Sequence, residues 1–236
     1  MKVCTDACIL GAFAAKVIQQ TTSNIQLQTS NFKLLDIGTG TGLLSLMIAQ
    51  ETNCTIHAVE IDNPAAEQAT ENITASSWPD RVKIFHASIQ DFVFSKEKIK
   101  GNIQPEYKYI ISNPPFFNNS LSGNNIQKNV AKHTAALSYP EIASAIDQLL
   151  LADGFAFIML PFEEMQLFKQ QMARKDFYPH HIFNIRQTEK HGFFRSIVMF
   201  SKGKIQDIEQ QELTIKINDT YSDDFIGLLK EYYLYL

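Results

Sequence analysis

Two short stretches of this 236-residue sequence combine residue types and spacings that could carry out chemistry. In the first, Asp36 ends an apolar run, and Gly38, Gly40 and Gly42 follow at alternate positions. Glycine accepts a positive φ and lets the backbone approach a ligand, so the stretch predicts a tight turn that presents N–H groups at a helix N-terminus. We expect a small anionic or nucleoside ligand at this turn.

The second stretch is the tetrapeptide Asn-Pro-Pro-Phe at residues 113–116, directly after a predicted strand at 107–112. The two prolines fix φ and remove backbone donors, which should hold the Asn113 amide and the Pro114 carbonyl rigidly at the carboxyl edge of a sheet. Both oxygens are acceptors that suit a planar NH₂ group, and the ring of Phe116 suits the face of a base or an amide. The stretch therefore indicates a site for an amino group conjugated to a planar system.

The spacing of the glycines separates the cofactors that use glycine-rich turns. A Walker loop would end in lysine and serine or threonine, whereas Gly42 is followed by Leu43. The dinucleotide fingerprint G-x-G-x-x-G meets Leu43 where its third glycine belongs. An acid followed by G-x-G-x-G instead resembles the first motif of class I methyltransferases, which implies S-adenosylmethionine (SAM) as the cofactor. The resemblance assigns four residues to the cofactor site: Asp36, Gly38, Gly40 and Gly42.

Two further acids follow predicted strands. Glu60 ends the strand at 55–60, at about the ~20-residue spacing where an acid accepts hydrogen bonds from ribose hydroxyls in doubly wound nucleotide sites. Asp91 follows the strand at 82–86, where class I methyltransferases recognise the cofactor adenine. For Asp91, a helix-capping or surface role is the alternative.

The elements that must position these residues alternate between strand and helix patterns, which implies a parallel sheet. After the fourth strand we expect a helix at 139–151, a strand at 154–160, a helix at 163–173 and two strands around residues 182 and 197–200. We predict an α/β, Rossmann-like class I methyltransferase fold with a seven-stranded, mostly parallel sheet and helices on both faces. The last pair of strands is expected to be antiparallel.

The length of the chain and its 45% hydrophobic content suit a single domain over residues 1–236. Within it we expect a helix at 5–18 that packs on the cofactor site, with Thr5 as a cofactor contact, and a C-terminal extension at 205–236 that packs on the domain. No apolar run has the ~20 residues of a membrane span, and no segment resembles a signal peptide, so we expect a cytoplasmic protein. The three cysteines lack C-x-x-C spacing and predict no metal site.

The formal net charge of −4 hides an asymmetry. Residues 36–91 hold eight acids and two bases, a net of −6, whereas residues 161–204 hold eight bases and four acids, a net of +4. A polyanion could therefore dock on the second half, with Arg186 and Arg195 among its contacts. The alternative is that the interleaved charges form only a solvated face.

The tetrapeptide at 113–116 resembles the N-P-P-[FY] signature of methyltransferases that act on adenine N6 or on the glutamine side-chain amide. The resemblance implies catalytic roles for Asn113, Pro114 and Phe116, with Asn113 also at the cofactor. Hydrogen bonds to both amino protons can aim the nitrogen lone pair at the methyl group, so positioning supplies most of the catalysis. No general base is needed in the first step, and His133 either touches phosphate or has no role.

A narrower resemblance covers the chain nearly end to end. The segments at 1–6, 10–13, 36–42, 75–79, 111–116 and 221–234 look like the bacterial tRNA1(Val) adenine-N6-methyltransferase family. This implies SAM-dependent methylation of the adenine just 3′ of the anticodon, by a monomeric cytoplasmic enzyme whose partner is tRNA. A polar loop at 117–134 is expected to close over the base. The expected substrate contacts are Phe116, Phe117, Lys128, Lys132, His133, Arg186 and Arg195.

Three other functions share part of this pattern. Glutamine N5-methyltransferases of release factors carry the same tetrapeptide but usually add an N-terminal helical domain, for which this chain has no room. DNA adenine methyltransferases usually add a target-recognition domain. A SAM-binding module without catalysis is the alternative from a different class, and the intact Asn113 and Phe116 argue against it.

Overall fold

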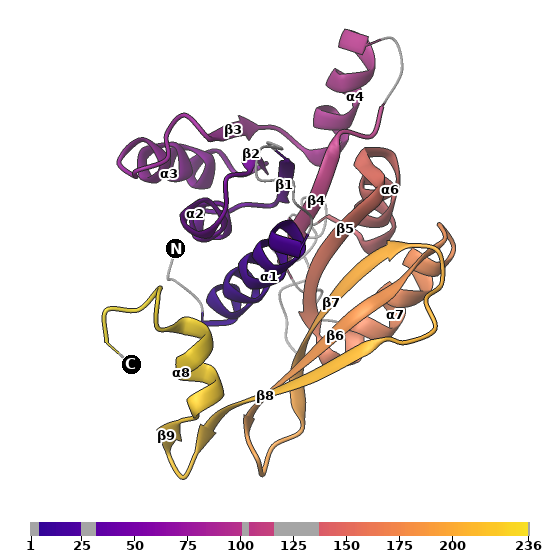
Figure 1. The fold of residues 1–236 in the computed structure, drawn as a ribbon. Helices are drawn as coiled ribbons and strands as arrows, with labels where there is room; N and C mark the ends of the chain where they lie inside the picture. The colour runs from indigo at the N-terminus through magenta and orange to yellow at the C-terminus, as the bar shows by residue number, and fades with distance from the viewer. Residues whose placement is uncertain (1–4, 25–31, 101–103, 116–136, 236) are drawn as a thin grey trace, which may run out of the picture.

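The computed structural model describes residues 5–24, 32–100, 104–115 and 137–235. Strands and helices alternate along the first two thirds of the chain, and strands dominate the rest (Figure 1). The strands are β1 Lys33–Ile37, β2 Thr55–Glu60, β3 Val82–His86, β4 Tyr107–Ser112, β5 Leu150–Pro161, β6 Phe177–Thr188, β7 Phe193–Lys202, β8 Glu209–Ile217 and β9 Thr220–Tyr221. The helices are α1 Thr5–Asn24, α2 Leu43–Glu51, α3 Asn63–Thr74, α4 Ile89–Lys100, α6 Tyr139–Leu149, α7 Phe162–Ala173 and α8 Asp223–Leu229.

The strands form one sheet in the order β3-β2-β1-β4-β5-β7-β6-β8-β9. The first five strands in this order are parallel, β7 is antiparallel to both β5 and β6, β8 is parallel to β6, and β9 is antiparallel to β8. The fold class is the predicted one, but the predicted count of seven strands is wrong. The additional strands β8 and β9 come from the C-terminal extension.

Helices cover both faces of the sheet (Figure 1). One hydrophobic core lies under α1, α2 and α8, and the second lies under α4, α6 and α7 on the other face. The two cores are built from alternate residues of the same strands, for example Leu34 in the first and Leu35 in the second. Burial on both faces explains why central strand segments such as residues 156–160 of β5 are continuously apolar.

The N-terminal helix continues to Asn24, whereas the sequence predicted that it ends at residue 18. Gln19 Nε2 donates to the backbone carbonyl of Glu51 at 2.8 Å, and Thr21 Oγ1 donates to the Val17 carbonyl at 2.8 Å. The Gln19 bond ties the end of α1 to the last turn of α2, so the two helices run side by side in the same direction. The Thr21 bond lies within α1, so both side chains have partners in a helical conformation.

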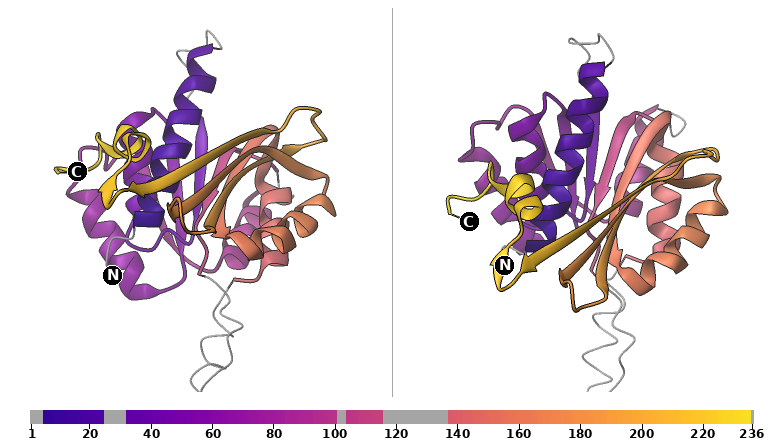
Figure 2. Two further views of the ribbon diagram at one scale, coloured as in Figure 1. Left: turned by 90° about the horizontal axis from the view of Figure 1, so that it is seen from below. Right: turned by 60° about the horizontal axis from the view of Figure 1, so that its bottom comes forward.

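The carboxyl ends of the parallel strands lie at one edge of the sheet. Because β7 runs antiparallel to β5, with Arg195 opposite Pro161, the turn between β6 and β7 reaches the same edge. Figure 2 shows α8 beside α1. Among the described residues, no helix has the length and apolar character that crossing a membrane requires.

Candidate active site

The glycine turn after β1 has the backbone conformation that the sequence predicted. Gly38, Gly40 and Gly42 have φ values of 72°, 59° and 85°, a region that other residues rarely adopt. The backbone N–H groups of Gly38 and Thr39 donate to the Val59 carbonyl of β2 at 2.9 and 3.1 Å. A Cβ at Gly38 would meet nothing within 4 Å, so the turn faces open space at the edge of the sheet.

Asp36 is fully buried directly before this turn. Its Oδ2 accepts hydrogen bonds from Thr39 Oγ1 at 2.6 Å and Ser45 Oγ at 2.8 Å, whereas Oδ1 accepts none from the part of the chain that the structure describes. Burial raises the pKa of Asp36 to about 6, although the two hydroxyl donors oppose the shift. A buried carboxylate oxygen without a donor suits a ligand that brings a polar hydrogen.

Glu60 ends β2 beside the turn and is largely buried. Its Oε2 accepts the Gly40 N–H at 2.8 Å and its Oε1 accepts the Asp62 N–H at 2.9 Å. Each carboxylate oxygen can accept a second hydrogen bond, so the residue can hold the glycine turn and still receive a pair of hydroxyl groups. The ribose contact stays a prediction.

Asp91 lies in the first turn of α4, after β3, and is exposed. Its backbone N–H donates to Ser88 Oγ at 3.0 Å, and the Ser88 hydroxyl donates to Asp91 Oδ2 at 2.7 Å. This reciprocal pair is a helix cap, which was the alternative considered from the sequence. An adenine contact by the same carboxylate remains a prediction.

Asn113 follows β4 at the same edge, next to β1. Ser112 Oγ donates to the Ile37 carbonyl at 2.8 Å, which ties the end of β4 to the strand that carries the glycine turn. Asn113 Oδ1 is buried and has no hydrogen-bond partner among the described residues, and the ring of Pro114 next to it is buried. Asn113 Oδ1 is therefore a buried acceptor that could receive a hydrogen bond from a ligand.

The expected substrate contacts separate into two groups. Five of them lie outside the described residues: Phe116, Phe117, Lys128, Lys132 and His133. Thr5, an expected cofactor contact, is the first residue of α1 and is exposed.

Arg186 and Arg195 both have protein partners. Arg186 Nε donates to Thr214 Oγ1 at 2.8 Å, and its Nη2 lies 3.3 Å from a carboxylate oxygen of Glu212 on β8. Arg195 Nε donates to Asp6 Oδ2 on α1 at 2.8 Å, and both side chains are mostly shielded from solvent. Each arginine therefore has a structural role, and phosphate contacts by them stay predictions.

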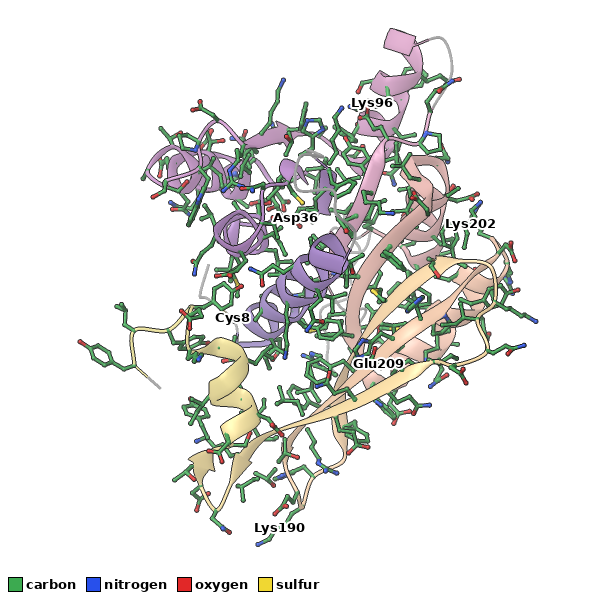
Figure 3. All side chains as sticks on the ribbon, in the orientation of Figure 1. Cys8, Asp36, Lys96, Lys190, Lys202 and Glu209 are labelled. Carbon is green, nitrogen blue, oxygen red and sulfur yellow. The ribbon has the colours of Figure 1, made fainter. Side chains whose placement is uncertain are left out.

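The basic run at 161–204 does not form one surface. Lys175 and Lys202 both pair with Asp147, at 3.3 and 3.1 Å, at the amino edge of the sheet. Lys190 lies in the turn between β6 and β7 at the carboxyl edge and is exposed. Figure 3 shows Lys190 and Lys202 at opposite ends of this hairpin. The prediction summed charge along the sequence and did not consider that the antiparallel pair β6–β7 places successive basic residues at opposite ends of the sheet.

The residues that hold the site residues in place were not predicted from the sequence. Thr39 and Ser45 hold Asp36, and the hydroxyls at these positions after the acid were the available signal. The pairing of Asp6 with Arg195 gave no signal, because the two residues lie 189 positions apart. In the described ranges, no group of three or more His, Cys, Asp or Glu side chains could hold a metal ion.

A glycine turn after the first strand, in a sheet whose seventh strand is inserted antiparallel beside the fifth, defines a class I SAM-dependent methyltransferase. The family model "Methyltransferase small domain" matches residues 5–138. A predicted O-methyltransferase from Agrobacterium tumefaciens has a similar solved structure, with a TM-score of 0.68, 12% identity and 95% coverage of each chain. The solved structure of a putative RNA methyltransferase from Pyrococcus horikoshii is also similar, with a TM-score of 0.52 and 17% identity, and the match covers 81% of this chain and 84% of that chain.

Full-length relatives define the family more narrowly. A tRNA1(Val) (adenine(37)-N6)-methyltransferase of Flavobacterium johnsoniae is 37% identical over 99% of this chain and 93% of its own length. The protein of the same name from Pseudoalteromonas translucida is 39% identical, with coverages of 99% and 92%. The chain belongs to the tRNA1(Val) (adenine(37)-N6)-methyltransferase family.

Proposed function

We propose that this protein transfers the methyl group of SAM to the exocyclic N6 of adenine 37 in tRNA1(Val), the adenine just 3′ of the anticodon. The names of relatives that match nearly the whole chain support this substrate. We further propose that the protein acts as a monomer in the cytoplasm.

The observation that carries this proposal concerns Asn113 at the end of β4, whose Oδ1 is buried and has no hydrogen-bond partner in the described part of the chain. A buried acceptor without a donor costs about 1–3 kcal/mol, so the fold keeps it for a group that arrives with the substrate. The amino group of adenine brings two protons, and the Pro114 carbonyl is a second acceptor next to Asn113. Together, the two acceptors would hold the amine and orient its lone pair.

The residues around the glycine turn fit the cofactor. SAM, when bound, supplies a methyl group on a positively charged sulfur. The open face at Gly38 would leave room for the cofactor. Asp36 Oδ1, which has no partner among the described residues, and the second lone pairs of Glu60 would accept its polar hydrogens. Asn113 lies at the end of the strand next to this turn, so the target amine and the methyl donor meet at one edge.

Holding the amine and the methyl donor in position then accounts for most of the rate enhancement of methyl transfer. Holding two reactants in line removes translational and rotational freedom before the reaction, which is worth up to ~7–11 kcal/mol of the barrier. The target base must leave its stack to reach a site inside the edge of the sheet. The amine becomes acidic once it is methylated, so its proton can be released to water after the transfer.

Glutamine N5-methylation presents the same NH₂ group to Asn113, and a single assay separates the two substrates. The protein is incubated with methyl-labelled SAM and either bulk tRNA that lacks the adenine-37 modification or a release-factor protein. We expect label in tRNA, as N6-methyladenosine at position 37. Label in the protein and not in the tRNA would contradict the proposal.

A further inference from the structure

The first turn of α1 lies at the same edge as the glycine turn. A Cβ at Gly11 would lie 2.7 Å from Met47 Sδ, so α1 and α2 pack closely at this point. Thr5 lies six residues before Gly11 on α1, and Gly42 lies five residues before Met47 on α2. At the rise of an α-helix, each is about 8–9 Å before the contact between the two helices. Since the helices run in the same direction, both begin at the carboxyl edge.

An ion pair anchors this turn to the sheet. Asp6 Oδ2 accepts a hydrogen bond from Arg195 Nε at 2.8 Å, and the exposed fractions of the two side chains are 14% and 20%. Arg195 lies opposite Pro161, the last residue of β5, and its guanidinium also covers the ring of Phe194 at 5.2 Å. The ion pair thus joins α1 to β7, the strand next to β5.

The C-terminal tail holds the same turn from the outside. The Tyr233 ring packs against the core under α1 and α2. Burial and the contact with the Cys8 side chain raise the pKa of the Tyr233 hydroxyl to about 12, and the contact with the Thr5 side chain opposes this shift. Gln50 Nε2 of α2 donates to the Glu231 carbonyl at 2.9 Å, which fixes the backbone of the tail two residues earlier. Figure 2 shows the tail leaving α8 beside α1.

The tail is itself anchored in the fold. Ser222 caps α8 by accepting the Phe225 N–H at 3.1 Å, and its hydroxyl donates to the Thr214 carbonyl of β8 at 2.6 Å. Phe225 and Leu229 of α8 are fully buried in the core that α1 also covers. Tyr233 therefore follows a helix whose position is fixed by packing and hydrogen bonds.

We propose that Tyr233, Asp6 and Arg195 form a clamp that sets the position of the first turn of α1 over the SAM site, and that Tyr233 is a positioning residue for cofactor binding. The inference rests on SAM binding at the glycine turn, which is part of the proposed function. α1 packs closely on α2 at Gly11, and α2 begins directly after the glycine turn, with Gly42 as its N-cap. A displacement of the first turn of α1 would therefore shift α2 and the glycine turn to which SAM is proposed to bind.

Tyr233→Phe tests the clamp with minimal change, because it removes one hydroxyl and keeps the ring in the core. Tyr235→Phe is the matched control, since Tyr235 lies two residues further on and is 91% exposed. Loss of a hydrogen bond typically costs a factor of about 3 to 10 in binding. By calorimetry, we expect SAM to bind Tyr233→Phe about 3- to 10-fold more weakly than wild type and Tyr235→Phe with unchanged affinity.

Asp6→Asn provides a second test from the other side of the turn. It should weaken SAM binding in the same way, raise KM for SAM and leave kcat at saturating SAM and tRNA within about twofold of wild type. If Asp6 had only a structural role, Asp6→Asn would lower the melting temperature of the protein without raising KM for SAM at a nearly unchanged kcat. Wild-type SAM affinity in both Tyr233→Phe and Asp6→Asn would overturn the clamp.

The calorimetric readout needs no tRNA, so the clamp and the proposed function can fail separately. Wild-type protein that binds SAM but does not methylate tRNA would contradict the proposed function and leave the clamp standing if Tyr233→Phe binds more weakly. Wild-type protein that does not bind SAM would contradict both.

Discussion

Glu60 is the residue whose contacts most constrain the cofactor site. Glu60→Ala removes the acceptor of the Gly40 N–H as well as the predicted ribose acceptor. Charge-assisted hydrogen bonds are worth ~1.5–3 kcal/mol each, so SAM affinity measured by calorimetry should fall by an order of magnitude or more. Glu67→Ala, at an exposed position of α3, is the control. Unchanged SAM affinity in Glu60→Ala would show that this acid does not face the ribose.

Asp36 should make stability depend on pH. Its pKa is raised by burial from 3.8 to about 6 in the folded protein, so between these values the folded state holds a proton that the unfolded state has lost. The free energy of unfolding should therefore fall as pH rises from about 4 to about 6. Asp36→Asn removes this contribution, and urea unfolding of both proteins across that range measures it. If the free energy of unfolding depended on pH in the same way in the wild type and in Asp36→Asn, the raised pKa of Asp36 would be contradicted.

At the scale of elements, the contact between α1 and α2 depends on a glycine. A Cβ at Gly11 would lie 2.7 Å from Met47 Sδ and 3.2 Å from Met47 Cβ, so Gly11→Ala should destabilise the fold by about 1–3 kcal/mol. Gly227→Ala in α8 is the control, because a Cβ there meets nothing within 4 Å. It should be neutral or stabilise the protein by ~0.4–1 kcal/mol. Equal urea midpoints for both variants would refute the close packing.

The sequence predicted some elements well and others poorly for identifiable reasons. β2, β3 and β4 have the predicted bounds because each is a short apolar run between turn residues. β8 was missed because its first four residues are polar and exposed, so its pairing with β6 depends on tertiary structure. In the site, the glycine turn is local and was predictable, whereas the Asp6–Arg195 pair joins distant parts of the chain.

At the scale of the whole molecule, charge should act at one edge of the sheet only. Binding of tRNA that neutralises phosphates falls with salt, with a slope of about −0.7 to −0.9 per phosphate. Lys190 is exposed at the carboxyl edge, so Lys190→Ala should weaken tRNA binding and reduce the magnitude of the slope by about 1. Lys202 pairs with Asp147 at the amino edge, so Lys202→Ala is the control and should leave the slope unchanged. Identical slopes for both variants would place the tRNA elsewhere.

The central claim is that Asn113 holds the amino group that receives the methyl. Asn113→Ala removes the buried acceptor, for which the described residues supply no donor, and leaves the glycine turn intact, so SAM should bind nearly as in wild type. The rate should fall by about 10²–10³, by analogy with the loss of one preorganised hydrogen bond at a transition state. Single-turnover methyl transfer to unmodified tRNA, measured on protein whose SAM affinity has been determined, tests this directly. A collapse in rate with near-normal SAM binding supports the claim, and wild-type turnover by Asn113→Ala would contradict it.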